Sequence, residues 1–116
     1  MKRGMEDKYG LSQQQLAVVR GILARFADKI DRAAVFGSRA SGGYRPNSDL
    51  DLVLYGDIDE RTADRIWTLF AESGLPFKVD VLVYHRIEEP ALRRHIDLVA
   101  ADLFTKEELL EEKTRQ

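Results

Sequence analysis

Residues 35–56 have the sequence VFGSRASGGYRPNSDLDLVLYG, and the fold class of the chain is predicted mainly from this stretch. The apolar run Ala33 to Phe36 ends at Gly37-Ser38 and is too short for a helix, so it predicts a buried strand. A brief helical turn is expected at Ser38 to Ser41, and the turn formers from Gly42 to Ser48 then predict a loop. The stretch therefore predicts a strand, a turn and a loop that lead into a second strand.

The second strand is predicted from Asp49 to Tyr55, because apolar residues alternate along it. Asp49 and Asp51 share the face opposite the leucines, with their Cα atoms about 7 Å apart. A third strand, Phe77 to Tyr84, carries Asp80 in the middle of the most apolar run of the chain. A lone buried carboxylate there is costly unless it is paired or bound to metal, so we expect Asp80 to join the other two carboxylates.

Helices are predicted on both sides of these strands. Ser12 with Gln15 forms a capping box, and an apolar stripe from Leu16 to Ile30 follows it at three- and four-residue steps. Asp57 with Glu60 predicts the start of another helix, whose apolar stripe, Trp67 included, is assigned to the core.

The C-terminal part predicts one more helix from Pro90, a short extended piece at 102–104, and a charged tail helix whose capping box is Thr105 with Glu108. This order of elements is typical of an α/β (α+β) fold with a small mixed β-sheet flanked by helices. We expect a single domain over residues 1–116, with a core at about 12–104 and a charged helical tail at 105–116.

The composition indicates a soluble protein without covalent cross-links. The hydrophobic fraction of 44% suffices for a core, and no apolar run approaches the roughly 18 residues of a membrane span. Cys is absent, which excludes disulfides and thiolate metal sites and fits a cytoplasmic location, as does the lack of an apolar centre in MKRGMEDKYG. With 18 basic and 20 acidic residues the net charge is −2, so direct binding to nucleic acid is not expected.

The spacing Gly37-Ser38, ten residues, then Asp49-Leu50-Asp51 predicts a phosphoryl-transfer site. Gly37 lets the backbone approach a ligand closely, and the Ser38 hydroxyl with the following N–H groups can receive phosphate oxygens. Three converging carboxylates repel one another, and Mg²⁺ removes that conflict because it prefers hard oxygen ligands. Two Mg²⁺ ions about 3.5–4 Å apart would hold the attacking and leaving oxygens of an in-line displacement.

Residues 35–56, together with KVDVLVY at residues 78–84, resemble the nucleotidyltransferase core of the DNA polymerase β superfamily. Within it the chain is most similar to the minimal nucleotidyltransferases encoded beside HEPN-domain ribonucleases as antitoxins. The resemblance covers residues from about 12 to 104. It implies that Gly37 and Ser38 hold the triphosphate, that Asp49 and Asp51 ligate both metal ions, and that Asp80 ligates the catalytic metal ion. Arg39 matches an often basic position and is assigned to phosphate neutralisation.

The resemblance also implies the reaction and the partner. AMP is expected to move from ATP to a hydroxyl of a HEPN-type toxin, a tyrosine, with this chain as the antitoxin that forms a hetero-oligomer with it. Larger relatives carry a further domain for the acceptor, whereas 36 residues follow Asp80 here, so the acceptor is expected on a separate molecule. Two alternatives remain open: a small-molecule (aminoglycoside-type) nucleotidyltransferase, and a non-catalytic binding module that masks a toxin. A plainer interpretation of Asp80 is that it pairs with a Lys or Arg. The plainer interpretation of Arg39 and Arg45 is that they are surface residues.

Overall fold

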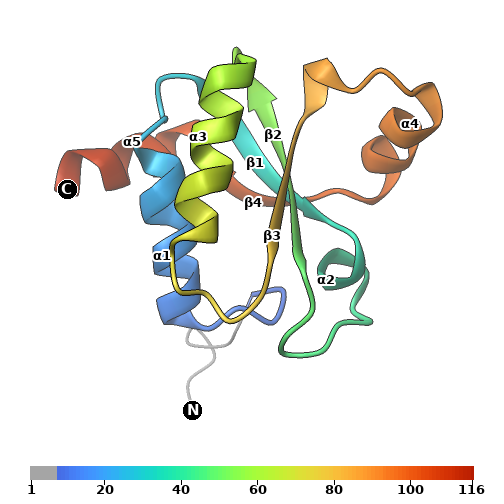
Figure 1. Ribbon diagram of the computed structural model, residues 1–116, viewed down its shortest axis with the longest axis horizontal. Helices are drawn as coiled ribbons and strands as arrows, with labels where there is room; N and C mark the ends of the chain where they lie inside the picture. The colour runs from blue at the N-terminus through green and yellow to red at the C-terminus, as the bar shows by residue number, and fades with distance from the viewer. Residues whose placement is uncertain (1–7) are drawn as a thin grey trace.

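The computed structural model describes residues 8–116, and in this part of the chain the strands form a four-stranded sheet in the order β3-β2-β1-β4 (Figure 1). The strands are β1 (Ile30–Phe36), β2 (Leu50–Gly56), β3 (Val79–Val83) and β4 (Ala101–Thr105). Strand β1 pairs antiparallel with both β2 and β4, and β2 pairs parallel with β3. The sheet is therefore mixed, as the sequence predicts.

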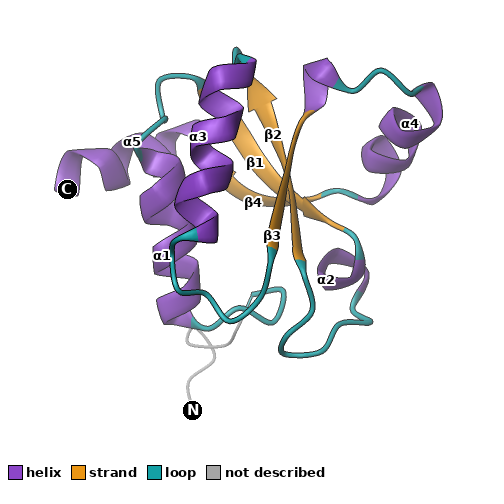
Figure 2. Ribbon diagram, viewed as in Figure 1, coloured by secondary structure: helices purple, strands orange, loops and turns teal. Residues whose placement is uncertain are grey.

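The helices lie on both sides of this sheet (Figure 2). One face is covered by α1 (Gln13–Ala24), α3 (Glu60–Ala71) and α5 (Lys106–Arg115), and the other face carries α4 (Pro90–Val99). The short α2 (Ser38–Ser41) follows β1, and a turn of 3₁₀ helix, η2 (Tyr84–Arg86), follows β3. The α3 crossover between β2 and β3 is what allows these two strands to run parallel.

The core is divided unequally between the two faces of the sheet. A larger apolar cluster fills the space under α1, α3 and α5, and the leucines of β2 belong to it. A smaller cluster of Ala34, Val53, Ile87 and Ile96 lies under α4. Asp51 lies two residues before Val53 on that same face and remains partly exposed. The polar site therefore lies on the face with the smaller core.

Local capping signals explain the first and last helices. Ser12 and Gln15 form the predicted capping box before α1, and Thr105 and Glu108 form the one before α5. The charged tail is more than a solvated appendage, because Leu109 is fully buried in the larger cluster. Among the described residues, no helix is long and apolar enough to cross a membrane.

Three details of the helices differ from the sequence prediction. Helix α1 ends at Ala24, and Ile30, predicted on its stripe, is instead the first residue of β1. Asp59, rather than Asp57, caps α3 by accepting a hydrogen bond from the Thr62 N–H at 2.8 Å. Trp67 is predicted in the core but is 50% exposed, because it follows the buried Ile66 by one position and so lies at the edge of the buried stripe.

Candidate active site

The predicted site residues are brought together at one end of the sheet. Because β1 and β2 are antiparallel, the end of β1 lies beside the start of β2, and the parallel pairing places the start of β3 there as well. Phe36 is the register partner of Asp51 on one side, and Asp80 is its partner on the other. Asp51 and Asp80 are therefore direct cross-strand neighbours on the same face.

Gly37 lies against the Asp51 carboxylate. Its backbone has φ 75° and ψ −155°, a conformation that is essentially restricted to glycine. A Cβ placed on Gly37 would lie 2.2 Å from Oδ2 of Asp51, which is well inside van der Waals contact. The sequence predicts that this glycine allows close approach to a ligand, and the structure shows a close approach to a site carboxylate.

The carboxylates of this site act on one another. The pKa of Asp51 is raised, first by burial, then by the charges of Asp80 and Asp49 and by a side-chain hydrogen bond with Asp80. The charge of Lys78 opposes this rise. Asp51 thus lies among like charges, and a cation bound there would relieve the repulsion.

Asp80 and Asp49 are both accessible to solvent. The sequence places Asp80 deep in an apolar strand, but it is the second residue of β3 and its side chain is 41% exposed. Its Oδ1 atom lies 3.5 Å from Nζ of Lys78, so the plainer interpretation of Asp80 as half of an ion pair describes its present contact. Asp49 is exposed and lies just before β2.

The site can suit a divalent metal ion only if that ion needs few protein ligands. Within residues 8–116, no group of three or more His, Cys, Asp or Glu side chains is arranged so that it could hold a metal ion. Mg²⁺ is commonly bound through one or two carboxylates, with water and substrate phosphates completing its shell. The adjacent Asp51 and Asp80 carboxylates supply hard oxygen ligands of that kind, and Asp49 lies close enough to act on Asp51. The donor set therefore fits Mg²⁺ that arrives with its own waters or phosphates.

Arg39 is placed differently from the prediction that it neutralises phosphate. Its side chain is 1% exposed, and its guanidinium donates hydrogen bonds to the carbonyl oxygens of Tyr9, Pro46 and Ser48 at 2.9 to 3.2 Å. It also lies over the ring of Phe77, with its Cζ atom 4.5 Å from the ring centroid. The guanidinium is therefore directed into the protein, where protein carbonyl oxygens take up its donors.

The contacts of Arg39 give it a structural role at the site. Pro46 and Ser48 belong to the loop that leads into Asp49, and this loop is otherwise largely exposed. Arg39 itself comes directly after Gly37-Ser38. A single buried side chain thus fixes the position of Asp49 relative to Gly37, joining the two halves of the sequence motif.

Ser38 and Lys78 complete the surroundings of the carboxylates. Ser38 is partly exposed at the start of α2, and its assignment to phosphate remains a prediction. Lys78 was not selected by the sequence reasoning. Its signal was present in the alternation of the third strand, which places residues 78, 80, 82 and 84 on one face.

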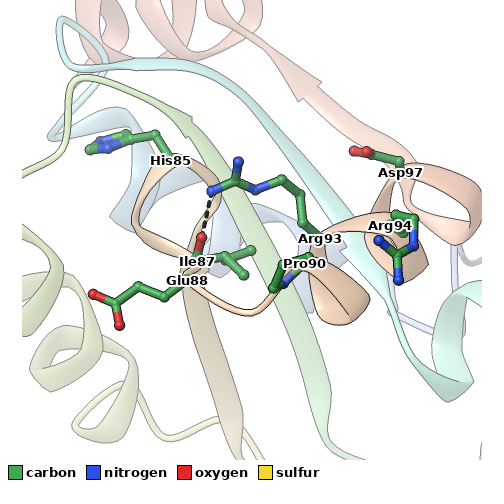
Figure 3. Close-up of a pocket in the computed structure, with 7 residues that line it drawn as sticks. All are labelled: His85, Ile87, Glu88, Pro90, Arg93, Arg94 and Asp97. Carbon is green, nitrogen blue, oxygen red and sulfur yellow. Dashed lines mark hydrogen bonds between the residues drawn. The ribbon is translucent and has the colours of Figure 1, made fainter.

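A separate hollow of about 530 Å³ lies between η2 and α4 (Figure 3). Its lining is mixed in charge: His85, Ile87, Glu88, Pro90, Arg93, Arg94 and Asp97. The Arg93 guanidinium donates to the carbonyl oxygen of Ile87, as the dashed line in Figure 3 shows, and Asp97 accepts a hydrogen bond from the Tyr84 hydroxyl at 2.7 Å. These contacts hold α4 to the end of β3, and none of the predicted site residues lines the hollow.

The site thus combines adjacent carboxylates at the starts of two parallel strands with a glycine turn against them, an arrangement that suits metal-assisted phosphoryl transfer. The chain belongs to the nucleotidyltransferase domain family, whose model matches residues 17–113 and so includes every predicted site residue. It is therefore a nucleotidyltransferase.

One relative is similar to the chain in sequence, and two solved structures are similar to it in fold. The chain is 33% identical, over 106 residues, to a probable protein adenylyltransferase MntA of Haemophilus influenzae, and the match covers 90% of this chain and 91% of that protein. Its fold is similar to a toxin–antitoxin crystal structure with AMP-PNP, with a TM-score of 0.60, 18% identity and coverage of 84% and 82% of the two chains. It is also similar to a mutant of the toxin–antitoxin MntA-HpeT, with a TM-score of 0.58, 15% identity and coverage of 81% and 76%.

Proposed function

We propose that this nucleotidyltransferase uses Mg²⁺ to move AMP from ATP to a hydroxyl of a protein partner, a tyrosine of a HEPN ribonuclease toxin, and that it acts as the antitoxin of that toxin. The observation that carries the proposal is the Asp51–Asp80 carboxylate pair, packed against Gly37 on the partly open face of the sheet. The names of the relatives, a protein adenylyltransferase and toxin–antitoxin pairs, support the acceptor class.

The carboxylates are proposed to hold two Mg²⁺ ions. Asp49 and Asp51 would ligate both ions and Asp80 one of them, and the bound ions would offset the charge that builds up on the transferred phosphate. The side chains of Asp51 and Asp80 are already neighbours, while Arg39 fixes the loop that presents Asp49. Gly37 leaves room for the carboxylate, and the Ser38 hydroxyl donates to a phosphate oxygen.

The proposed reaction is a substitution at the α-phosphorus of ATP. The acceptor oxygen forms a bond to that phosphorus, the bond to the bridging oxygen of pyrophosphate breaks, and the hydroxyl proton is lost to solvent. The acceptor has to approach along the face of the sheet that α4 covers only in part. A hydroxyl presented by another protein fits an open site of this kind.

Ligand binding is tested by thermal unfolding with Mg²⁺ or Mn²⁺, alone and with each nucleoside triphosphate. Metal should stabilise the protein because it relieves the repulsion around Asp51, and metal with ATP should stabilise it further. At a ligand concentration of 100 times Kd, the gain is about 2.7 kcal/mol. Unfolding that is indifferent to metal with every triphosphate would contradict the proposed site.

Transfer is tested by incubating the protein, Mg²⁺ and ATP with the product of the neighbouring gene and weighing that product by mass spectrometry. One or more added AMP units with loss of ribonuclease activity is the expected result, and Asp51→Asn should abolish it. Asp57→Asn is the matched control, because Asp57 is an exposed aspartate after the other end of β2. A silenced but unmodified partner would favour the masking module, and no interaction would favour a small-molecule acceptor.

A further inference from the structure

Lys78 is a basic residue beside the carboxylates with no role in the function proposed above. It lies directly before β3, and its carbonyl oxygen accepts a hydrogen bond from the Leu50 N–H at 2.9 Å. That bond joins the start of β3 to the start of β2, so the backbone of Lys78 is fixed beside the site. Its side chain shares the face of Asp80 by strand alternation.

The ammonium of Lys78 is held weakly. Its Nζ atom is 3.5 Å from Oδ1 of Asp80, and its side chain is 64% exposed. Exposed ion pairs of this kind contribute little to stability, so the ammonium can leave Asp80 at little cost. Arg39 contrasts with it, because its buried guanidinium is held by the carbonyl oxygens of the loop.

Metal ions and a nucleotide at this site would change the charges around Lys78. In the protein alone, the ammonium offsets part of the mutual repulsion of Asp51 and Asp80. Metal ions on the same carboxylates would repel it, while a triphosphate would bring new negative charge within reach of its flexible four-carbon stem. The most favourable partner of Lys78 then becomes a phosphate oxygen.

We propose that Lys78 is a triphosphate-binding residue, which pairs with Asp80 in the free protein and transfers to the phosphate oxygens of the metal-bound nucleotide. The inference rests on the proposed function, since it requires metal and a nucleoside triphosphate at this site. It predicts that one substitution changes two affinities in opposite directions. Lys78→Gln removes a cation that competes with metal, and it also removes a cation that holds phosphate.

The test measures both affinities by titration calorimetry: Mn²⁺ alone, and a non-hydrolysable ATP analogue with saturating Mn²⁺. Lys78→Gln should bind Mn²⁺ alone at least as tightly as the wild type, and it should bind the analogue roughly tenfold or more weakly, the range of a hydrogen bond to a charged group. Lys78→Arg keeps the charge and should retain most of the analogue affinity. Lys113→Gln is the matched control, because Lys113 forms an exposed ion pair with Asp28 at the same 3.5 Å, on α5.

Each outcome decides the inference. Opposite changes in Lys78→Gln, with Lys113→Gln unchanged, support it, whereas equal weakening of both affinities would show a structural role and overturn it. Unchanged analogue affinity in Lys78→Gln would overturn the inference while leaving the proposed function intact. A wild-type protein that binds neither Mn²⁺ nor any nucleotide would refute the proposed function, and the inference with it.

Discussion

Replacing Gly37 with alanine should damage both the stability and the activity of this nucleotidyltransferase, for two separable reasons. The first is the backbone, because φ 75° with ψ −155° is a region that residues with a Cβ adopt only under strain. The second is the new methyl group, which would lie 2.2 Å from Oδ2 of Asp51 and 3.2 Å from its Cγ. Either the carboxylate must rotate away or the strand end must shift.

The expected size of the effect follows from these two terms. Strained backbone of this type costs roughly 1–3 kcal/mol. The contact of the new methyl group with Asp51 adds an interaction energy, and such energies between contacting residues are typically roughly 0.5–3 kcal/mol. Together the two terms give roughly 1.5–6 kcal/mol, and a value in the lower half of that range corresponds to a fall in Tm of roughly 10 °C for a domain of this size. Activity should fall further than the unfolded fraction explains, because the displaced group is a predicted metal ligand.

The chain offers matched glycine controls for unfolding measured with urea. Gly42→Ala introduces a side chain at φ 100° with nothing within 4 Å, so it isolates backbone strain. Gly43→Ala also meets nothing within 4 Å and should be nearly neutral. Repeating Gly37→Ala in an Asp51→Ala background removes the carboxylate, so the cost of the substitution should fall to the backbone term alone.

The reasoning would be refuted by either of two results. If Gly37→Ala were as harmless as Gly43→Ala in both unfolding and activity, the described backbone at Gly37 would be wrong. If its destabilisation were the same with and without the Asp51 carboxylate, the close contact between them would have no energetic consequence.

Three further predictions concern other parts of the molecule. Asp51→Asn should make the metal-free protein more stable than the wild type at pH 7, because the pKa of Asp51 is raised on folding and its charged form therefore opposes folding. This gain in stability should shrink as the pH falls towards 4, where the carboxyl group becomes protonated in both states. A difference in stability that stayed constant between pH 4 and 7 would contradict this cause. Arg39→Met should destabilise the protein by roughly 2 kcal/mol or more in urea unfolding, because buried carbonyl oxygens lose their donor. Arg39→Lys should recover only part of the lost stability. An Arg39→Met protein as stable as the wild type would refute the role of Arg39 in fixing the loop. Thr105→Ala should cost about 1 kcal/mol by the same measurement, because it removes the cap of α5, and a loss within error would show that α5 is held by packing alone.

The sequence was sufficient wherever structure depends on residues close together along the chain. Both capping boxes form, at Ser12 and at Thr105, because each joins groups three residues apart. The strand that carries Asp51 alternates as predicted, and the turn after Gly37 forms a short helix. The mixed sheet flanked by helices and the membership of the nucleotidyltransferase family were also predicted from the sequence.

The features that depend on contacts between distant elements could be seen only in the folded chain. Apolar spacing alone did not separate a longer first helix from a helix followed by a strand, because Ile30 is buried in either case; its pairing with Gly56 on β2 settles it. Trp67 and Arg39 were each assigned to the wrong environment for a related reason. A side chain's polarity gives its average burial, whereas the packing of its neighbours gives the actual one.

The candidate site also has some features that are local in the sequence and others that depend on the folded chain. The sequence predicts that Asp49, Asp51 and Asp80 form it, because residue identity and spacing along a strand are local properties. Only the tertiary structure made Asp51 and Asp80 register partners, placed the carboxylate against Gly37, and paired Lys78 with Asp80. These relations join segments separated by loops and a crossover helix, and their geometry depends on strand register and on burial, which exist only in the folded chain.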